Sequence, residues 1–277
     1  MNDSNQAVML PRTPHTPERH TFLVAAYKTS PYLEACLKSL RAQTVQSRIV
    51  ISTSTPFDGL QDIAKRFDAE YFIHSPHQGI ANDWNQGLTQ IDSGWITIAH
   101  QDDIYLPQFT EKVLNAIQGF KDPVLIFTGY AEIVADTIRT YSLLLWIKRV
   151  LLNLGFLGRP SISSIFAKSN CLRFGCPIPC PAVTFRSGER SVRFDQAYKV
   201  DLDWAAWLSK AQGPGQFLWI REVLMQHRIH AESETSSGIS EGYRAAEDYK
   251  LLRRLWPKPI AWIIAKSYAI AYSSNKG

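Results

Sequence analysis

The sequence predicts an α/β protein with a mostly parallel sheet flanked by helices. Three observations support this: short apolar runs alternate with helical periodicity over residues 21–100, 45% of the 277 residues are hydrophobic, and two adjacent aspartates follow the fourth apolar run. Alternating strands and helices are typical of parallel sheets, in which helices connect successive strands. The chain is long enough to bury a sizeable core in one main domain.

The first half of the chain contains four expected strands and three expected helices. The strands are short apolar runs, as buried strands are, at residues 21–26, 48–52, 71–74 and 95–99. Leu33, Leu37 and Leu40 recur at helical spacing, and further helices are expected at residues 60–67 and after Gly79. In such a sheet, ligands bind beyond the carboxyl ends of the strands.

The second half begins with a helix expected at residues 109–120 and a strand at 124–127. Two later segments, 141–157 and 251–272, mix leucine, isoleucine and tryptophan with basic residues such as Lys148. Segments of this kind can lie in a membrane interface with their cations at the headgroups. They can equally be ordinary helices packed on the sheet, and the pattern leaves both alternatives open.

The charge balance favours acidic partners. A net charge of +5 and a pI near 9.0 suit nucleotide phosphates or an anionic membrane surface. No nucleic-acid partner is expected, because the basic residues are spread out and no nucleic-acid-binding motif accompanies them. Cys171, Cys176 and Cys180 lack the paired spacing of a zinc site, and four cysteines do not indicate a disulfide framework.

Residues 1–20 are polar, contain three prolines and lack the apolar stretch of a signal peptide. We expect them to be a disordered lead-in. No apolar run reaches the length of a transmembrane helix. The expected location is therefore cytoplasmic, with peripheral attachment to the inner face of the cell membrane if the amphipathic segments bind lipid.

The most informative feature is the pair Asp102 and Asp103, directly after the fourth expected strand. Two carboxylates at the carboxyl end of a strand suit a divalent cation held against phosphate oxygens. The alternative is a simple turn, because aspartate is common in turns and Pro107 suits the start of a helix. Cation-dependent chemistry on a nucleotide is the first functional hypothesis.

Five segments carry a resemblance in the same order as in a known family. They are Leu23-Val-Ala-Ala-Tyr27 with the helix that follows, Gly79-Ile-Ala-Asn-Asp-Trp-Asn85, His100-Gln-Asp-Asp-Ile-Tyr-Leu-Pro107, Val200-Asp-Leu-Asp203-Trp, and His227-Arg-Ile-His230. Together they resemble family 2 glycosyltransferases, which have the Rossmann-like, nucleotide-sugar-binding GT-A fold. The resemblance spans residues 21–235 and implies a nucleotide-binding half at 21–107 and an acceptor half at 108–235. Residues 236–277 are expected to form a C-terminal amphipathic helical extension.

The resemblance implies an inverting, cation-dependent transfer of a hexose from a nucleotide-sugar donor. The acceptor is expected to be a glycan or a lipid-linked molecule in surface polysaccharide or lipopolysaccharide synthesis. Asp102, Asp103 and His230 are expected to hold Mn²⁺ or Mg²⁺. Asp203 is expected to be the catalytic base, with Asp201 as the fallback. The residues expected at the nucleotide sugar are Ala25, Tyr27, Thr53, Asn85, His100, Gln101 and Arg228.

The sequence also departs from the family pattern. The second strand runs into Ser52-Thr53-Ser54-Thr55 where members usually carry carboxylates, so the nucleotide base stays open. The metal motif begins with His100 in place of the usual aspartate, which suggests a subgroup with a His-Gln-Asp-Asp motif, and Trp84 stands where many members carry arginine. Two alternatives remain: a metal-dependent nucleotidyltransferase and a non-catalytic, membrane-associated sugar-binding protein.

Overall fold

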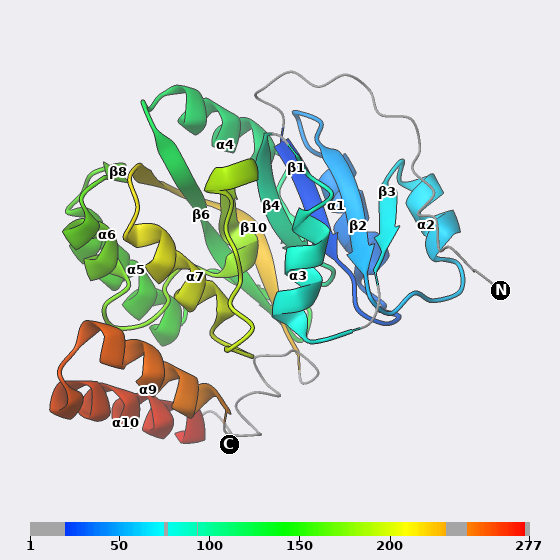
Figure 1. Ribbon diagram of the computed structural model, residues 1–277. Coiled ribbons are helices and arrows are strands. Elements are labelled where there is room, and N and C mark those ends of the chain that lie inside the picture. The colour runs from blue at the N-terminus through cyan, green and yellow to red at the C-terminus, as the bar shows by residue number, and fades with distance from the viewer. Residues whose placement is uncertain (1–19, 75–76, 93, 231–242, 275–277) are drawn as a thin grey trace.

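The structure is a computed structural model that describes residues 20–74, 77–92, 94–230 and 243–274. Its centre is a ten-stranded sheet in the order β3-β2-β1-β4-β9-β6-β10-β5, with β7 beside β6 and β8 beside β10 (Figure 1). The strands are β1 (His20–Ala25), β2 (Arg48–Thr53), β3 (Glu70–Ile73), β4 (Trp95–His100), β5 (Ile104–Tyr105), β6 (Pro123–Val134), β7 (Thr137–Arg139), β8 (Ser161–Ile162), β9 (Val183–Arg186) and β10 (Gln216–Ile229).

Helices connect and cover these strands. They are α1 (Leu33–Arg41), α2 (Leu60–Arg66), α3 (Ile80–Leu88), α4 (Phe109–Gln118), α5 (Leu143–Phe156), α6 (Ile165–Cys171), α7 (Leu202–Ala211), α9 (Tyr243–Leu255) and α10 (Lys258–Ser274). Strands β3, β2, β1 and β4 run parallel, as does β6 with β10, while the short strand β9 pairs antiparallel with both β4 and β6. The predicted α/β sheet is confirmed.

The core lies on both faces of the sheet, because side chains alternate along each central strand. On β1, Phe22 and Val24 join a cluster with α1, α2 and α4, whereas Leu23 joins a cluster with α3, α6 and α7. All three side chains are almost fully buried. A strand buried on both faces reads as a continuous apolar run, which explains why the first strands could be predicted.

The expected lead-in at residues 1–20 includes one residue of the sheet, and its other residues lie outside the described part of the chain. His20 is the first residue of β1; it is buried and its ring lies 2.8 Å from the Thr97 hydroxyl. The C-terminal segment contains the helices α9 and α10 and packs on the core. Leu251 and Leu252 of α9 and Ala261 of α10 are fully buried in the core cluster.

Each amphipathic segment therefore buries part of its surface in the core. In α5, Leu145, Leu152 and Phe156 are buried, and Gly155 lets the helix approach Cys171 of α6 closely. Figure 1 shows α5, α6, α9 and α10 grouped at one end of the molecule. Within the described residues, no helix combines the length and hydropathy needed to cross a membrane.

Candidate active site

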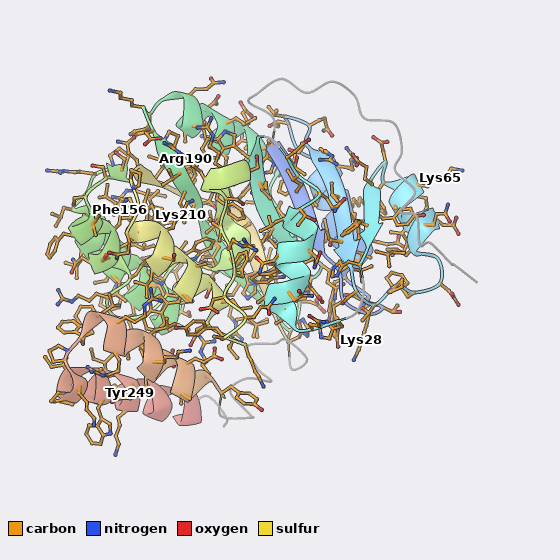
Figure 2. All side chains as sticks on the ribbon, in the orientation of Figure 1. Lys28, Lys65, Phe156, Arg190, Lys210 and Tyr249 are labelled. Atoms are coloured by element: carbon orange, nitrogen blue, oxygen red, sulfur yellow. The ribbon has the colours of Figure 1, made fainter. Side chains whose placement is uncertain are left out.

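The predicted site residues gather at the carboxyl edge of the sheet, where β1, β2, β4 and β10 end. This is the lower edge in Figure 1, and Lys28, which follows β1, lies there in Figure 2. Ala25 at the end of β1 stands beside His100 at the end of β4 in the sheet register. The chain turns at Asp102 and Asp103 and then enters β5, which pairs with β10.

Asp103 is fully buried at this turn and is held by the end of β10. One carboxylate oxygen accepts a hydrogen bond from the Arg228 backbone N–H at 2.9 Å and lies 3.0 Å from Nδ1 of His227. The structure thus brings in His227, which was not among the predicted ligands. The only signal for it in the sequence was its place in the His-Arg-Ile-His segment.

Asp102 lies closer to solvent and meets His230, its expected partner. Nε2 of His230 lies 2.8 Å from an Asp102 carboxylate oxygen. The Arg228 guanidinium stacks over the Tyr32 ring and donates from Nε to the Asp102 carbonyl oxygen at 3.1 Å. Asp102 and His230 are 128 residues apart in the sequence, and the structure brings them together, with Arg228 beside them.

A second cluster at the same edge combines one carboxylate with two imidazoles. It consists of Asp103, His100 and His227. Their ligand atoms lie within 4.8 Å of one another. Burial lowers the pKa of His100 despite the nearby Asp103 and Asp102 carboxylates. Burial alone would also lower the pKa of His227, but the contact with Asp103 outweighs it and raises that pKa. An imidazole with a lowered pKa, an imidazole with a raised pKa and a buried carboxylate therefore lie together.

Gln101, which is expected at the nucleotide sugar, binds the backbone of the loop after β1. Its side-chain amide accepts from the Tyr27 N–H at 3.0 Å and donates to the Tyr27 carbonyl at 2.9 Å, which clamps the loop after β1 to the loop after β4. Thr53 is buried, and its hydroxyl accepts from the Thr55 N–H at 3.1 Å. Gln101 and Thr53 thus hold the backbone around the site.

A carboxylate reaches the end of β2 from another element. Asp83 of α3 accepts a hydrogen bond from the Ser54 hydroxyl at 2.7 Å, and the same oxygen lies 2.7 Å from Nδ1 of His77. The His77 ring lies 5.0 Å from the ring of Tyr27. The hydroxyl-rich end of β2 is therefore accompanied by an acid that the strand's own sequence lacks.

Asn85 connects the two halves of the domain. Its amide donates to the Phe194 carbonyl at 2.7 Å and accepts from the Phe194 N–H at 3.0 Å, so both amide atoms bind backbone. The neighbouring Trp84 stacks on His100 with ring centroids 5.3 Å apart. These contacts fix α3, and through Trp84 they set the orientation of the His100 ring.

On the acceptor side, α7 presents Asp203 in its first turn. Its side chain is half-buried and accepts from the Trp204 N–H at 2.7 Å. Burial raises the pKa of Asp203 above its ordinary value, although Arg244, Lys148 and His100 act in the opposite direction. Asp201, the fallback, occupies the N-cap position and is buried, with its pKa raised to about 8 by burial. Accessibility favours Asp203 over Asp201.

Lys148 lies on the packed side of α5, as the second of the two alternatives for the 141–157 segment predicts. Its ammonium donates to the Tyr130 hydroxyl at 2.7 Å, on the inner side of α5. Elsewhere, a shallow pocket beside α7 is lined by Arg190 and Lys210, but Figure 2 shows these residues well away from the edge marked by Lys28. That pocket is separate from the Asp102 edge.

Comparisons with known sequences agree with this geometry. EpsH of Bacillus subtilis (strain 168), which is named as a glycosyltransferase, is 31% identical over 125 residues, covering 43% of this chain and 36% of EpsH. RP339 of Rickettsia prowazekii (strain Madrid E), an uncharacterized glycosyltransferase, is 21% identical over 224 residues, covering 80% of this chain and 67% of RP339. The chain thus spans about a third of the length of EpsH and about two thirds of that of RP339.

Solved structures share the fold at low sequence identity. A fragment of S. aureus TarS in complex with UDP-GlcNAc matches with a TM-score of 0.64 at 10% identity, over 89% of this chain and 70% of that one. Mannosyltransferase PcManGT from Pyrobaculum calidifontis, in complex with GDP-Man and Mn²⁺, matches with a TM-score of 0.58 at 16% identity, over 92% and 72% of the two chains. The expected GT-A fold is confirmed.

The family assignment rests on more than half of the chain. The model of glycosyl transferase family 2 matches residues 21–184, which include the whole edge from Ala25 to Asp103. The segments that carry Asp203 and His230 lie beyond the matched range but meet that edge in the fold. The chain belongs to glycosyl transferase family 2.

Proposed function

We propose that the protein transfers a hexose from a nucleotide sugar to an acceptor hydroxyl with inversion of configuration. The observation that carries this proposal is the meeting of Asp102 and His230, with Asp103 and His227 behind them, at the carboxyl edge of a nucleotide-sugar-binding fold. Donors are bound in the similar structures of TarS and PcManGT, with UDP-GlcNAc and GDP-Man respectively.

The side chains at the edge fit a divalent cation. A set that combines carboxylate oxygens with imidazole nitrogens suits Mn²⁺ better than Mg²⁺, which prefers oxygen ligands and water. Asp102 and His230 would hold the ion from the solvent side, and Asp103 with His100 or His227 from within. When bound, the cation supplies positive charge to the leaving diphosphate, and Arg228 adds a fixed charge beside it.

Asp203 is the proposed base for the acceptor hydroxyl. A carboxylate with a raised pKa is a stronger proton acceptor than an ordinary one, provided that it is ionised at the working pH. Its hydrogen bond to the Trp204 N–H fixes one oxygen, which leaves the other to accept the hydroxyl proton as the hydroxyl attacks the anomeric carbon. Direct attack from the face opposite the diphosphate inverts the configuration.

We further propose a peripheral location on the cytoplasmic face of the membrane, with a glycan or lipid-linked acceptor in surface polysaccharide or lipopolysaccharide synthesis. The support is an exposed apolar surface on α5, α6 and α10, here called the α5–α10 surface. Its members are Leu143, Leu144, Trp146, Ile147 and Leu154 on α5, Ile165 and Phe166 on α6, and Ile260, Trp262 and Ile263 on α10. So many exposed large apolar side chains on three helices at one end of the molecule are unusual for a soluble monomer.

The experiment for the activity is a panel of nucleotide sugars incubated with Mn²⁺ and membrane lipid extract, with released nucleoside diphosphate as the readout. We expect turnover with one class of donor and a loss of about a hundredfold or more in Asp102→Ala. Asp68→Ala, at a highly exposed carboxylate in the turn after α2, should retain full activity. Pyrophosphate as the product would instead indicate nucleotidyl transfer, and glycan binding without any turnover would indicate a sugar-binding protein.

A further inference from the structure

Lys148 is a half-buried cation that has no role in the proposed transfer reaction. Its side chain is half-buried on the inner side of α5, and its ammonium donates to the Tyr130 hydroxyl at 2.7 Å. Within the described residues no salt bridge holds Lys148, although ordinary buried lysines are paired with a carboxylate. An ammonium carries three donors, so Tyr130 leaves part of its capacity available.

The surroundings of Lys148 belong to the acceptor side of the site. Burial lowers its pKa, but Tyr130, Cys176 and Glu132 outweigh this and raise it, so the lysine stays charged at neutral pH. Tyr130, its partner, lies on β6 two residues before Glu132, which stands beside His227 of β10 in the sheet register. Lys148 therefore lies next to the end of β10, and its charge also opposes the rise in the pKa of Asp203.

Helix α5 joins this space to the exposed apolar surface. Its inner face carries Lys148, and its outer face carries Leu143, Ile147 and Leu154, which are 74%, 41% and 60% exposed. Residues four apart on a helix share a face, so Leu143 and Ile147 point together away from the sheet. A molecule held at this outer face by an apolar chain can reach Lys148 around a single helix.

An acceptor that carries a phosphate needs a positive charge near Asp203. A phosphate next to the attacking hydroxyl would be repelled by the Asp203 carboxylate unless a positive charge lay between them or beside them. The Lys148 ammonium and the Tyr130 hydroxyl can both donate to phosphate oxygens, which is a charge-assisted arrangement. We propose that Lys148, steadied by Tyr130, binds the phosphate group of a lipid-linked acceptor and so sets its hydroxyl against Asp203. This assignment rests on the proposed glycosyl transfer.

The test is direct binding of three probes to the full chain: geranyl phosphate, geraniol and inorganic phosphate. Wild type should bind geranyl phosphate more tightly than either of the other two, because each of those lacks one half of the ligand. Lys148→Met should weaken geranyl phosphate binding by about tenfold or more, as expected for losing a charge-assisted hydrogen bond. Lys148→Arg should restore most of the affinity, and Lys65→Met, on the distant helix α2, should bind like wild type.

Three results would overturn the assignment. Unchanged geranyl phosphate affinity in Lys148→Met would show that Lys148 does not bind the phosphate. Equal affinity for inorganic phosphate and geranyl phosphate would show that the apolar chain does not contribute to binding. A loss in Lys148→Arg as large as the loss in Lys148→Met shows that the positive charge does not bind the phosphate. Donor turnover by wild type is measured separately, so that a failure of the proposed function is recognised without these probes.

Discussion

At the residue scale, the site is built from side chains that bind one another across long stretches of sequence. Asp103 is fully buried and binds the end of β10, whereas Asp102 and His230 meet nearer to the solvent. The inner group fixes the turn, and the outer pair lies where a ligand from solvent can reach it. A substitution at Asp103 should therefore affect both stability and activity, because it would leave the His227 imidazole without its partner.

The pH dependence of the reaction should report Asp203. The base works as a carboxylate, so kcat/KM falls when the pH drops through its pKa, which burial raises above the ordinary value of 3.8. We expect the acid limb of the pH profile to lie above that value and to be preserved in Asp201→Asn. A limb that disappears in Asp201→Asn would transfer the role of base to the fallback residue.

The sequence predicts the types of several side chains at the Asp102 edge, but it does not show which contacts they make. The amides of Gln101 and Asn85 both bind backbone, because loops at the edge need their N–H and C=O groups satisfied. His227 was not among the predicted ligands, and the sequence left open whether Lys148 faces the core or the surface. Periodicity shows that α5 has two faces, but not which of its polar residues turns inward.

At the element scale, the strands through β4 could be predicted because they are continuous apolar runs between turn residues. Strand β10 could not, because Arg221 and Glu222 interrupt it, and register shifts accommodate them against β6. Helix α9 reads as basic and amphipathic, yet Leu251 and Leu252 complete the core. Long-range packing, which local pattern does not encode, decided each of these cases.

The contact between α5 and α6 gives a stability prediction. A Cβ added at Gly155 would overlap the side chain of Cys171 and lie 2.8 Å from its Cα, so the two helices must move apart. Gly155→Ala should cost about 1–3 kcal/mol of unfolding free energy, despite the better helix propensity of alanine. Urea denaturation checks this, with Gly119→Ala as the control, since its nearest neighbour lies at an ordinary 3.5 Å. Equal stability of the two variants would show that the helices are not closely packed.

At the scale of the whole molecule, one end carries the Asp102 edge, where we propose that the nucleotide sugar binds, and the other carries the α5–α10 surface. Helix α5 belongs to both regions, with Lys148 on its inner side and Leu143 on its outer side. Basic residues such as Arg173 and Lys266 accompany the apolar side chains and suit anionic headgroups. The arrangement would hold the acceptor side of the site toward a membrane.

Membrane contact predicts that the protein floats with vesicles of anionic phospholipid at low salt and floats less at high salt. Leu143→Ser combined with Trp262→Ser should reduce the floating fraction severalfold, because both side chains are more than half exposed on the α5–α10 surface. Ile73→Ser, at an exposed residue of β3 on the opposite side of the molecule, is the matched control and should float like wild type. Flotation that is the same in all variants would argue against this surface.

The central claim is a division of labour between the Asp102 edge and Asp203, and one paired measurement tests it. Nucleotide-sugar affinity in the presence of Mn²⁺ and the rate of transfer are determined side by side for Asp102→Ala and Asp203→Asn. We predict that Asp102→Ala weakens donor binding, whereas Asp203→Asn binds the donor like wild type and loses about a hundredfold or more in rate. Donor affinity that falls in Asp203→Asn, or transfer that survives in it, would contradict the account.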